Sequence, residues 1–324
     1  MVQASVIIAA YNAEAFIADA VRSAAGQTLD EIEIIVVDDC STDATAAIVA
    51  GLAAGDARIR LVRQERNAGP AAARNRAIDV ARGRWIAILD ADDRYEPPRL
   101  ERLIGLAEER GADLASDNLW MDPEDQPESG TTMIPRSILS EPRQLELPEF
   151  VERNVHDSHH PGCNFGFLKP IFRAAFLADH ALRYDESVRF AEDFTFYVAC
   201  LRRGARWWLT PEPLYHYLIR ARSLTQVQTV HDLGRLREQQ RQLLIEAQAT
   251  GDRQLERLVR RHMVVVDRCY YYRWFTDEVK ARRPGAALRV LGASRASARL
   301  IAAEAIRQAP VIAAKAFGGG YRKD

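Results

Sequence analysis

Three carboxylates follow an apolar run early in the chain. Residues 84–95 read R-W-I-A-I-L-D-A-D-D-R-Y, so Asp90, Asp92 and Asp93 come directly after five apolar residues. Such a run is typical of a strand buried on both faces. Carboxylates this close raise one another's pKa unless a cation is present. The cluster therefore indicates either a metal-assisted site or an acidic turn ahead of a helix.

A divalent cation would explain why the acids are held together. Mg²⁺ and Mn²⁺ prefer carboxylate oxygens, and Mg²⁺ usually takes one or two carboxylates together with substrate phosphates. The sequence has no G-x-x-x-x-G-K-[ST] segment and no G-x-G-x-x-G after its first strand. Neither a P-loop nor a dinucleotide site is therefore expected. A bound phosphate would need another counter-charge, which a metal on these aspartates would supply.

The elements that must position these acids alternate between strands and helices. Strands are expected at 5–10, 32–37, 59–62, 85–89 and 112–120, and helices at 13–25, 44–54, 70–81 and 98–110. Asn12 and Asp43 are in position to cap the first two helices. This alternation predicts an α/β fold with a mainly parallel sheet and right-handed crossovers. Polar clusters after the first, second and fourth strands should meet at one edge of that sheet, where ligands of such folds bind.

The chain changes character twice after residue 120. Residues 121–147 read as a long loop, 169–179 as a helix and 207–219 as a strand, while Glu192 and Asp193 open another helix. From residue 229 onward apolar residues recur at helical spacing. We therefore expect one domain over 1–228, with a nucleotide-binding part (1–120) and an acceptor-binding part (121–228), and a helical region over 229–324.

Composition narrows the class of protein. The chain has 324 residues and a net charge of −1, which argues against nucleic acid as a partner. No basic n-region and no long apolar run is apparent, so a cytoplasmic protein without a spanning helix is expected. Residues 282–324 carry nine Lys or Arg against two acids. This basic region favours either peripheral contact with the inner face of the membrane or a solvated or oligomer-packing helix, and a homo-oligomer is left open.

Five segments together resemble a known family. They read A-Y-N-A-E, V-V-D-D-C-S-T-D, N-A-G-P-A-A-A-R-N, L-D-A-D-D and A-E-D, in this order between residues 2 and 225. Their order and spacing resemble the inverting glycosyltransferases of family 2, which have the GT-A fold. The resemblance is closest to bacterial enzymes that build exopolysaccharide, capsule or O-antigen, including the succinoglycan type. It does not extend into the helical region after residue 229.

The resemblance implies a nucleotide site, a metal ligand and a catalytic base. The nucleotide contacts would come from Ala10, Tyr11, Glu14, Asp39, Arg74, Asp90, Arg220, Arg222 and Ser223. In this set Asp39 would hold the base, usually uracil. Asp92 would bind Mn²⁺ or Mg²⁺, and Asp193 would be the catalytic base. On local sequence alone, Glu192 and Asp193 read equally well as first-turn acids that favour a helix dipole.

Two positions depart from the family pattern. The family often has proline where Ala9 stands and glycine where Cys40 stands. Neither residue is a ligand in the family, so the departures question the local backbone geometry rather than the activity.

The function implied is metal-dependent inverting transfer of a sugar from a nucleotide-sugar. A UDP-sugar is the expected donor, and the acceptor would be a saccharide or a polyprenyl-diphosphate-linked oligosaccharide. A sugar-nucleotide nucleotidyltransferase is one alternative, but a glycine-rich basic loop would then be expected after the first strand, where A-Y-N-A-E stands. A non-catalytic nucleotide-sugar-binding protein would not need Asp193. A glycoside hydrolase would use two carboxylates but none of the nucleotide motifs.

Overall fold

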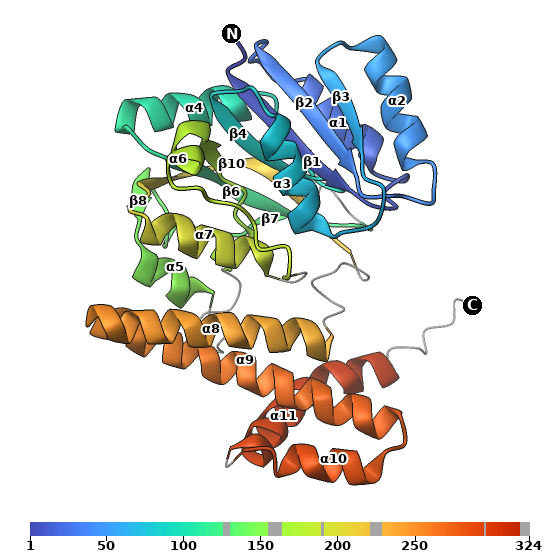
Figure 1. The fold of residues 1–324 in the computed structure, drawn as a ribbon, viewed down its shortest axis with the longest axis vertical. Helices are drawn as coiled ribbons and strands as arrows, with labels where there is room; N and C mark the ends of the chain where they lie inside the picture. The colour runs from blue at the N-terminus through green and yellow to red at the C-terminus, as the bar shows by residue number, and fades with distance from the viewer. Residues whose placement is uncertain (126–129, 155–163, 189–190, 221–228, 295, 318–324) are drawn as a thin grey trace. The chain divides into compact units, whose positions relative to one another are not determined.

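The chain divides between Gln226 and Val227 into two units, Met1–Gln226 and Val227–Asp324. The structure is a computed structural model that describes residues 1–125, 130–154, 164–188, 191–220, 229–294 and 296–317. In the described residues, the first unit contains a sheet with flanking helices and the second contains helices alone (Figure 1). The sequence places its domain boundary at residue 228, next to the point where these units divide.

One mixed sheet organises the first unit. Its described strands are β1 (Ala4–Ala10), β2 (Ile32–Asp38), β3 (Ile59–Arg63), β4 (Trp85–Asp90), β5 (Arg94–Tyr95), β6 (Leu114–Pro123), β7 (Thr131–Thr132), β8 (Arg143–Leu145), β9 (Ile171–Arg173) and β10 (Trp207–Ile219). They pair in the order β3-β2-β1-β4-β9-β6-β10-β5, with β7 on β6 and β8 on β10. Strands β1 to β4 run parallel and are almost wholly buried, except for the half-exposed β3. Their continuous apolar runs suit strands that are covered on both faces.

The helices of the first unit come both before and after β4 in the sequence, and they flank the sheet. They are α1 (Ile17–Ala25), α2 (Thr45–Gly55), α3 (Pro70–Val80), α4 (Arg99–Arg110), α5 (Leu147–Arg153), α6 (Ala174–Asp179) and α7 (Glu192–Arg202), with a 3-10 turn η1 at Phe165–Phe167. Helix α3 begins at Pro70 directly after Gly69, whose φ of 92° suits a residue without a side chain. Helices α3 and α7 both lie in front of the sheet in Figure 1.

The segment 169–179 differs from the helix that the sequence predicts. Its first part forms β9, which lies between β4 and β6 and runs antiparallel to both, with Ile171 opposite Ala87 and Ala115. Only Ala174–Asp179 is helical. A short apolar run suits either a strand or a buried helix, and here the open edges of β4 and β6 decide for a strand by supplying hydrogen-bond partners. The helix prediction is therefore wrong for residues 169–173.

Three further predictions need correction. Asn12 does not cap α1, which begins later, at Ile17; instead Asn12 Oδ1 accepts the Thr42 backbone N–H at 2.8 Å. The loop expected over 121–147 contains the short strands β7 and β8. Asp43 is not the N-cap of α2 either, because Ala44 occupies that position; Asp43 Oδ1 accepts the Thr45 backbone N–H at 2.9 Å, where α2 begins.

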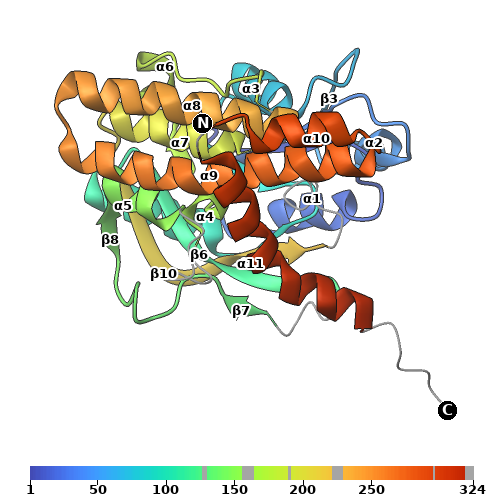
Figure 2. The ribbon, with the colours of Figure 1, turned by 90° about the horizontal axis from the view of Figure 1, so that it is seen from below.

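The second unit is built on a helical hairpin. Its helices are α8 (Val230–Thr250), α9 (Arg253–Lys280), α10 (Pro284–Leu291) and α11 (Ser297–Phe317). Helices α8 and α9 pair side by side, and α10 and α11 pack against α9 (Figure 2). Tyr271, Val290 and Ile301 form a buried cluster, with the neighbouring aromatic residues of α9 packed around it. In the residues that the structure describes, no helix has the length and apolar character needed to cross a bilayer.

Candidate active site at the carboxyl edge of the sheet

The register of the parallel strands brings the predicted clusters to one edge. Ala9 of β1 lies opposite Asp90 of β4, and Ala10 lies opposite Asp38 of β2. The ends of these three strands are therefore level with one another. The acidic segment after β4 and the segments after β1 and β2 consequently share this edge, as the sequence predicts.

Four charged side chains from different elements form a closed ring of ion pairs at this edge. Arg74 of α3 donates from Nη2 to Asp90 Oδ1 (2.8 Å) and from Nη1 to Asp193 Oδ1 (3.1 Å). Lys169, which precedes β9, lies with Nζ 2.8 Å from both Asp90 Oδ2 and Asp193 Oδ2. We call Arg74, Asp90, Lys169 and Asp193 the ion-pair ring. Each carboxylate of the ring contacts both cations, so the ring joins β4 to the N-terminus of α7.

Burial makes these charges depend on one another. Arg74 is only 5% exposed, and a buried charge without partners costs several kcal/mol. Burial opposes ionisation of Asp90, but Lys169 and Arg74 outweigh it and hold the pKa of Asp90 below its ordinary value. Glu192 also accepts from Arg74 Nη1, at 2.7 Å. Burial nevertheless raises the pKa of Glu192, although Arg74 opposes this. The pKa of Asp90 is thus lowered and the pKa of Glu192 is raised.

Asp92 has a different partner from Asp90. Its carboxylate contacts the guanidinium of Arg220, which follows β10 and lies over the ring of Phe16, 4.7 Å from its centre. Burial and the charge of Asp90 nonetheless raise the pKa of Asp92. The contact with Arg220 therefore does not offset the effects of burial and of Asp90 on the pKa of Asp92.

Asp93 does not pair with Arg74, Lys169 or Arg220. It is 2% exposed and accepts hydrogen bonds from the Tyr215 hydroxyl (2.6 Å) and the Leu218 backbone N–H (2.8 Å). Burial, together with Asp92 and Asp90, raises the pKa of Asp93 well above its ordinary value. This side chain fastens β10 to the turn after β4, so its position is explained by the fold.

A divalent cation fits the chemistry of this edge. Four carboxyl groups (Asp90, Asp92, Glu192 and Asp193) face three basic groups (Arg74, Lys169 and Arg220). The carboxyl groups thus outnumber the basic groups by one, and a further cation beside Asp92 would balance them. Among the described residues, no group of three or more His, Cys, Asp or Glu is arranged to hold a metal alone. Asp92 would therefore hold a cation jointly with a ligand such as a diphosphate.

The residues predicted to contact the nucleotide lie around the ends of β1 and β2. Tyr11 directly follows β1 and is 50% exposed, so its ring is available to a ligand. Glu14 accepts the Ala44 backbone N–H at 2.9 Å. Asp39 is buried, and its carboxylate accepts the backbone N–H groups of Ala68 (2.8 Å) and Gly69 (2.7 Å). Asp39 thereby ties the end of β2 to the turn that leads into α3.

Arg74 meets the acids of β4 and α7 in this structure. Its predicted contact with the base and ribose stays a prediction, as do the nucleotide roles of Ala10, Tyr11 and Asp39. The predicted residues Arg222 and Ser223 lie outside the described residues.

Cys40 explains one departure from the family pattern. Its backbone φ is 62°, in the left-handed region that glycine adopts most easily. The geometry that glycine would favour is therefore kept with a cysteine, at a cost of about 1–2 kcal/mol. Ala9 lies within β1 in regular pairing with Val37 of β2, so the strand is not interrupted where the family often has proline.

Lys169 is a site residue that the sequence does not predict. A helix is predicted to begin at Lys169, whereas the structure places this lysine between η1 and β9 with its side chain in the ion-pair ring. One signal was available, because Lys169 is the first lysine in the sequence and stands inside an apolar run. A lysine in such a run requires carboxylate partners if it is buried.

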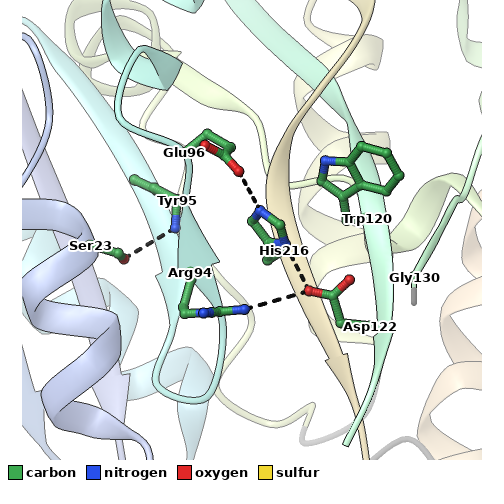
Figure 3. Close-up of a pocket in the computed structure, with 8 residues that line it drawn as sticks. All are labelled: Ser23, Arg94, Tyr95, Glu96, Trp120, Asp122, Gly130 and His216. Carbon is green, nitrogen blue, oxygen red and sulfur yellow. Dashed lines mark hydrogen bonds and ion pairs between the residues drawn. The ribbon is translucent and has the colours of Figure 1, made fainter. Parts of the chain in front are cut away.

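A separate hollow lies between α1 and the strands β5, β6 and β10 (Figure 3). It has a volume of about 530 Å³ and is lined by Ser23, Arg94, Tyr95, Glu96, Trp120, Asp122, Gly130 and His216. His216 bridges two of its acids, with Nδ1 2.7 Å from Asp122 Oδ2 and Nε2 2.8 Å from Glu96 Oε1. These groups are paired with one another, and none of the residues predicted for the site lines the hollow. The ion-pair ring is therefore the stronger candidate for the active site.

Comparison with known proteins identifies the family. A family model described as glycosyl transferase family 2 matches residues 5–176, more than half of the chain. The chain belongs to glycosyl transferase family 2. The family and the enzyme class that the motifs predict are thus confirmed.

Two relatives from Rhizobium meliloti (strain 1021) are similar to this family 2 protein. Succinoglycan biosynthesis protein ExoO is 43% identical over 222 residues, which span 68% of this chain and 62% of ExoO. Succinoglycan biosynthesis protein ExoU is 37% identical over 272 residues, which span 84% of this chain and 78% of ExoU. The chain therefore matches less than two thirds of the length of ExoO.

Solved structures agree with the predicted fold. S. aureus TarS 1-349 in complex with UDP-GlcNAc gives a TM-score of 0.64 at 20% identity, over 99% of this chain and 94% of that chain. Mannosyltransferase PcManGT from Pyrobaculum calidifontis, in complex with GDP-Man and Mn²⁺, gives a TM-score of 0.57 at 17% identity, over 94% and 80%. These likenesses confirm the GT-A fold.

Proposed function

We propose that this family 2 protein is a metal-dependent inverting glycosyltransferase for cell-surface polysaccharide synthesis. It transfers a sugar from a nucleotide-sugar, with a UDP-sugar as first candidate, to a saccharide or a polyprenyl-diphosphate-linked oligosaccharide. The observation that carries the proposal is the position of Asp193. Its carboxylate stands at the first turn of α7, beside Asp90 at the end of the strand that precedes Asp92. A base and a metal ligand would thus stand at one edge of the sheet.

Asp193 would act on the acceptor. The hydroxyl oxygen of the acceptor sugar attacks the anomeric carbon of the donor, and the bond from that carbon to the diphosphate oxygen breaks. Asp193 takes the hydroxyl proton as the new bond forms, a contribution that is typically worth ~10² to 10⁴-fold in rate. Arg74 and Lys169 donate to this carboxylate and fix its direction. A single displacement of this kind inverts the anomeric centre.

The leaving nucleoside diphosphate would be stabilised by positive charge. Asp92 would hold the divalent cation, which when bound neutralises charge on the diphosphate. Arg220 contacts Asp92 and carries a second positive charge at the same point. Two observations on other proteins support this assignment: PcManGT binds GDP-Man together with Mn²⁺, and TarS binds UDP-GlcNAc.

Tyr11 and Asp39 would contact the nucleotide base of the donor. The ring of Tyr11 is half exposed at the end of β1, where it offers a flat apolar face. Asp39 already accepts N–H groups from Ala68 and Gly69, so a contact with uracil would share or replace those hydrogen bonds. The base preference is therefore coupled to the turn ahead of α3.

A donor screen tests the proposed function. With Mn²⁺ present, the protein should slowly hydrolyse a UDP-sugar and release UDP, while GDP- and dTDP-sugars react at least tenfold more slowly. Calorimetry with UDP, GDP and dTDP should give the same order of affinity. Tyr11→Ala is the matched variant. It should lower the affinity for all three nucleotides by a similar factor, because packing against the tyrosine ring does not depend on which nucleotide base is bound. Equal affinity of the wild-type protein for the three nucleotides would refute the uracil preference.

The products distinguish the alternative functions. A sugar-nucleotide nucleotidyltransferase joins a nucleoside triphosphate to a sugar phosphate and releases pyrophosphate, whereas glycosyl transfer releases a nucleoside diphosphate. A non-catalytic binding protein releases neither. The segment A-Y-N-A-E after β1 has no glycine or lysine with which to hold a triphosphate, which favours glycosyl transfer.

We also propose that the basic stretch 282–324 contacts an anionic membrane surface. Arg282, Arg289 and Arg299 are exposed. Basic residues near an anionic leaflet contribute about 1 kcal/mol each, screened by salt. A lipid-linked acceptor would bring the enzyme to such a surface. A solvated or oligomer-packing region is the alternative.

Liposome co-sedimentation tests the membrane contact. Replacing Arg282, Arg289 and Arg299 by Gln should lower binding to anionic vesicles roughly tenfold or more at low salt. Substitution is preferable to truncation, because Ile301 of α11 packs with Tyr271 of α9.

A control variant of equal charge change carries Gln at the exposed Arg241, Arg253 and Arg257 of α8 and α9, and it should bind like the wild-type protein. Binding that is equal for both triple variants, or insensitive to salt, would remove the stretch 282–324 from membrane contact.

A further inference from the structure

Lys169 is held at the centre of the candidate site by the fold itself. Strand β9 pairs antiparallel with β4, with Ile171 opposite Ala87, so the chain just before β9 runs alongside the last residues of β4. The Tyr197 hydroxyl of α7 donates to the Leu168 carbonyl at 2.9 Å. Arg99, which forms a fully buried ion pair with Asp117, donates to the Lys169 carbonyl. The backbone of Lys169 is thus fastened on two sides.

The Lys169 side chain is buried and charged. It is 4% exposed, and an isolated ammonium group in such a place would lose its proton instead of staying charged. Burial lowers the pKa of Lys169, but Asp193 and Asp90 outweigh it and hold the pKa well above its ordinary value. Its two ion pairs, each of 2.8 Å, are therefore the condition for its burial.

Lys169 and Arg74 divide the carboxylate oxygens of the ring between them. Arg74 contacts the Oδ1 atoms of Asp90 and Asp193, while Lys169 contacts both Oδ2 atoms. Arg74 also binds Glu192, and its expected contact with the donor nucleotide would draw it away from Asp193. Lys169 would then be the cation that still holds Asp193 in place. Its short reach between two fixed carboxylates suits a compact ammonium group better than a planar guanidinium.

The use of lysine here also stands out from the rest of the chain. Lys169 is the first lysine in the sequence, and the next is Lys280 in the helical unit. Every other fixed cation of residues 1–226 is an arginine. The cation between the Oδ2 atoms of Asp90 and Asp193 is thus a lysine, in a unit whose other fixed cations are arginines.

We propose that Lys169 is a positioning residue for glycosyl transfer: it orients the base Asp193 and ties it to Asp90 on the donor side of the site. This inference rests on the proposed function, in which Asp193 takes the proton of the acceptor hydroxyl. In this role Lys169 acts through Asp193 and Asp90 and is not itself a catalytic residue. Its loss should therefore slow transfer while donor binding stays intact.

Replacement of Lys169 by Ala tests this role through a split between turnover and binding. In Lys169→Ala, kcat for transfer should fall at least tenfold, whereas the affinity for UDP measured by calorimetry stays within threefold of wild type. Methylamine or ethylamine added to the assay should restore part of the lost kcat, because a small ammonium ion can occupy the vacated position. A purely structural role would not respond to an amine.

Controls keep the result interpretable. Lys280→Ala removes an exposed lysine of α9 and should leave transfer and its amine dependence as in wild type. If Lys169→Ala does not fold, as judged by circular dichroism, Lys169→Met keeps the apolar length of the side chain and takes its place in the same assays.

Transfer by the folded variant within threefold of wild type would overturn the proposal, as would a loss of UDP affinity equal to the loss of turnover. An active Asp193→Asn protein would overturn the proposed function instead, so the two failures are distinct.

Discussion

Asp193→Asn should lose transfer while keeping its donor. We expect the rate of sugar transfer to fall by ~10² to 10⁴-fold, because asparagine cannot take the acceptor proton. UDP affinity should stay within a few-fold of wild type, because binding of the donor does not require the carboxylate of the catalytic base Asp193. Arg74 keeps Asp90 and Glu192 as partners in this variant, and Lys169 keeps Asp90. The ring therefore retains most of its charge pairing, and the protein should remain folded.

Glu192→Gln is the neighbouring comparison for this result. It removes a carboxylate that also binds Arg74 but leaves Asp193 in place, so its loss of transfer should be clearly smaller. Calorimetry with UDP and a transfer assay on both variants separate binding from chemistry. A large loss of UDP affinity with unchanged kcat in Asp193→Asn would make Asp193 a donor-site residue instead of the base.

Asp92→Asn should abolish metal-dependent turnover of the donor. The variant loses the carboxylate that would hold the cation, so the leaving diphosphate keeps its charge uncompensated. Arg220 also loses its ion pair with Asp92, so the diphosphate would be its remaining anionic partner. Turnover is measured over a range of Mn²⁺ and Mg²⁺ concentrations, and Mn²⁺ binding is measured separately in the presence of UDP. Activity within a few-fold of wild type under the same metal would remove Asp92 from the metal site.

Asp93→Asn provides the matched control for the metal assignment. This side chain accepts hydrogen bonds from the Tyr215 hydroxyl and the Leu218 backbone N–H. Its substitution should therefore lower the free energy of unfolding and leave the dependence of turnover on Mn²⁺ nearly unchanged. If Asp93→Asn and Asp92→Asn changed Mn²⁺ dependence equally, the assignment to Asp92 alone would be wrong.

Much of the first unit could be predicted because its signals are local. The apolar runs at β1, β2 and β4 are buried on both faces, and Pro70 after Gly69 marks the start of α3. Predictions failed where distant partners decide the structure. Asn12 has the chemistry of a helix cap, yet its amide oxygen accepts from Thr42, thirty positions along the chain. Local propensity cannot register such a competitor.

The three aspartates show the same limit within the site. Their spacing suggests one cluster with one purpose. In the folded protein Asp90 pairs with Arg74 and Lys169, Asp92 with Arg220, and Asp93 with β10. These partners come from elements that only tertiary packing brings to the end of β4.

The sequence by itself determined the family, the fold class and the edge of the sheet where the acids lie, because spaced motifs and apolar periodicity are written along the chain. Tertiary structure alone decided that a strand, β9, enters between β4 and β6 and carries Lys169 to Asp193. The physical reason is that a short apolar segment takes the conformation that satisfies its backbone hydrogen bonds. Those partners lie more than fifty residues away from it, on β4 and β6.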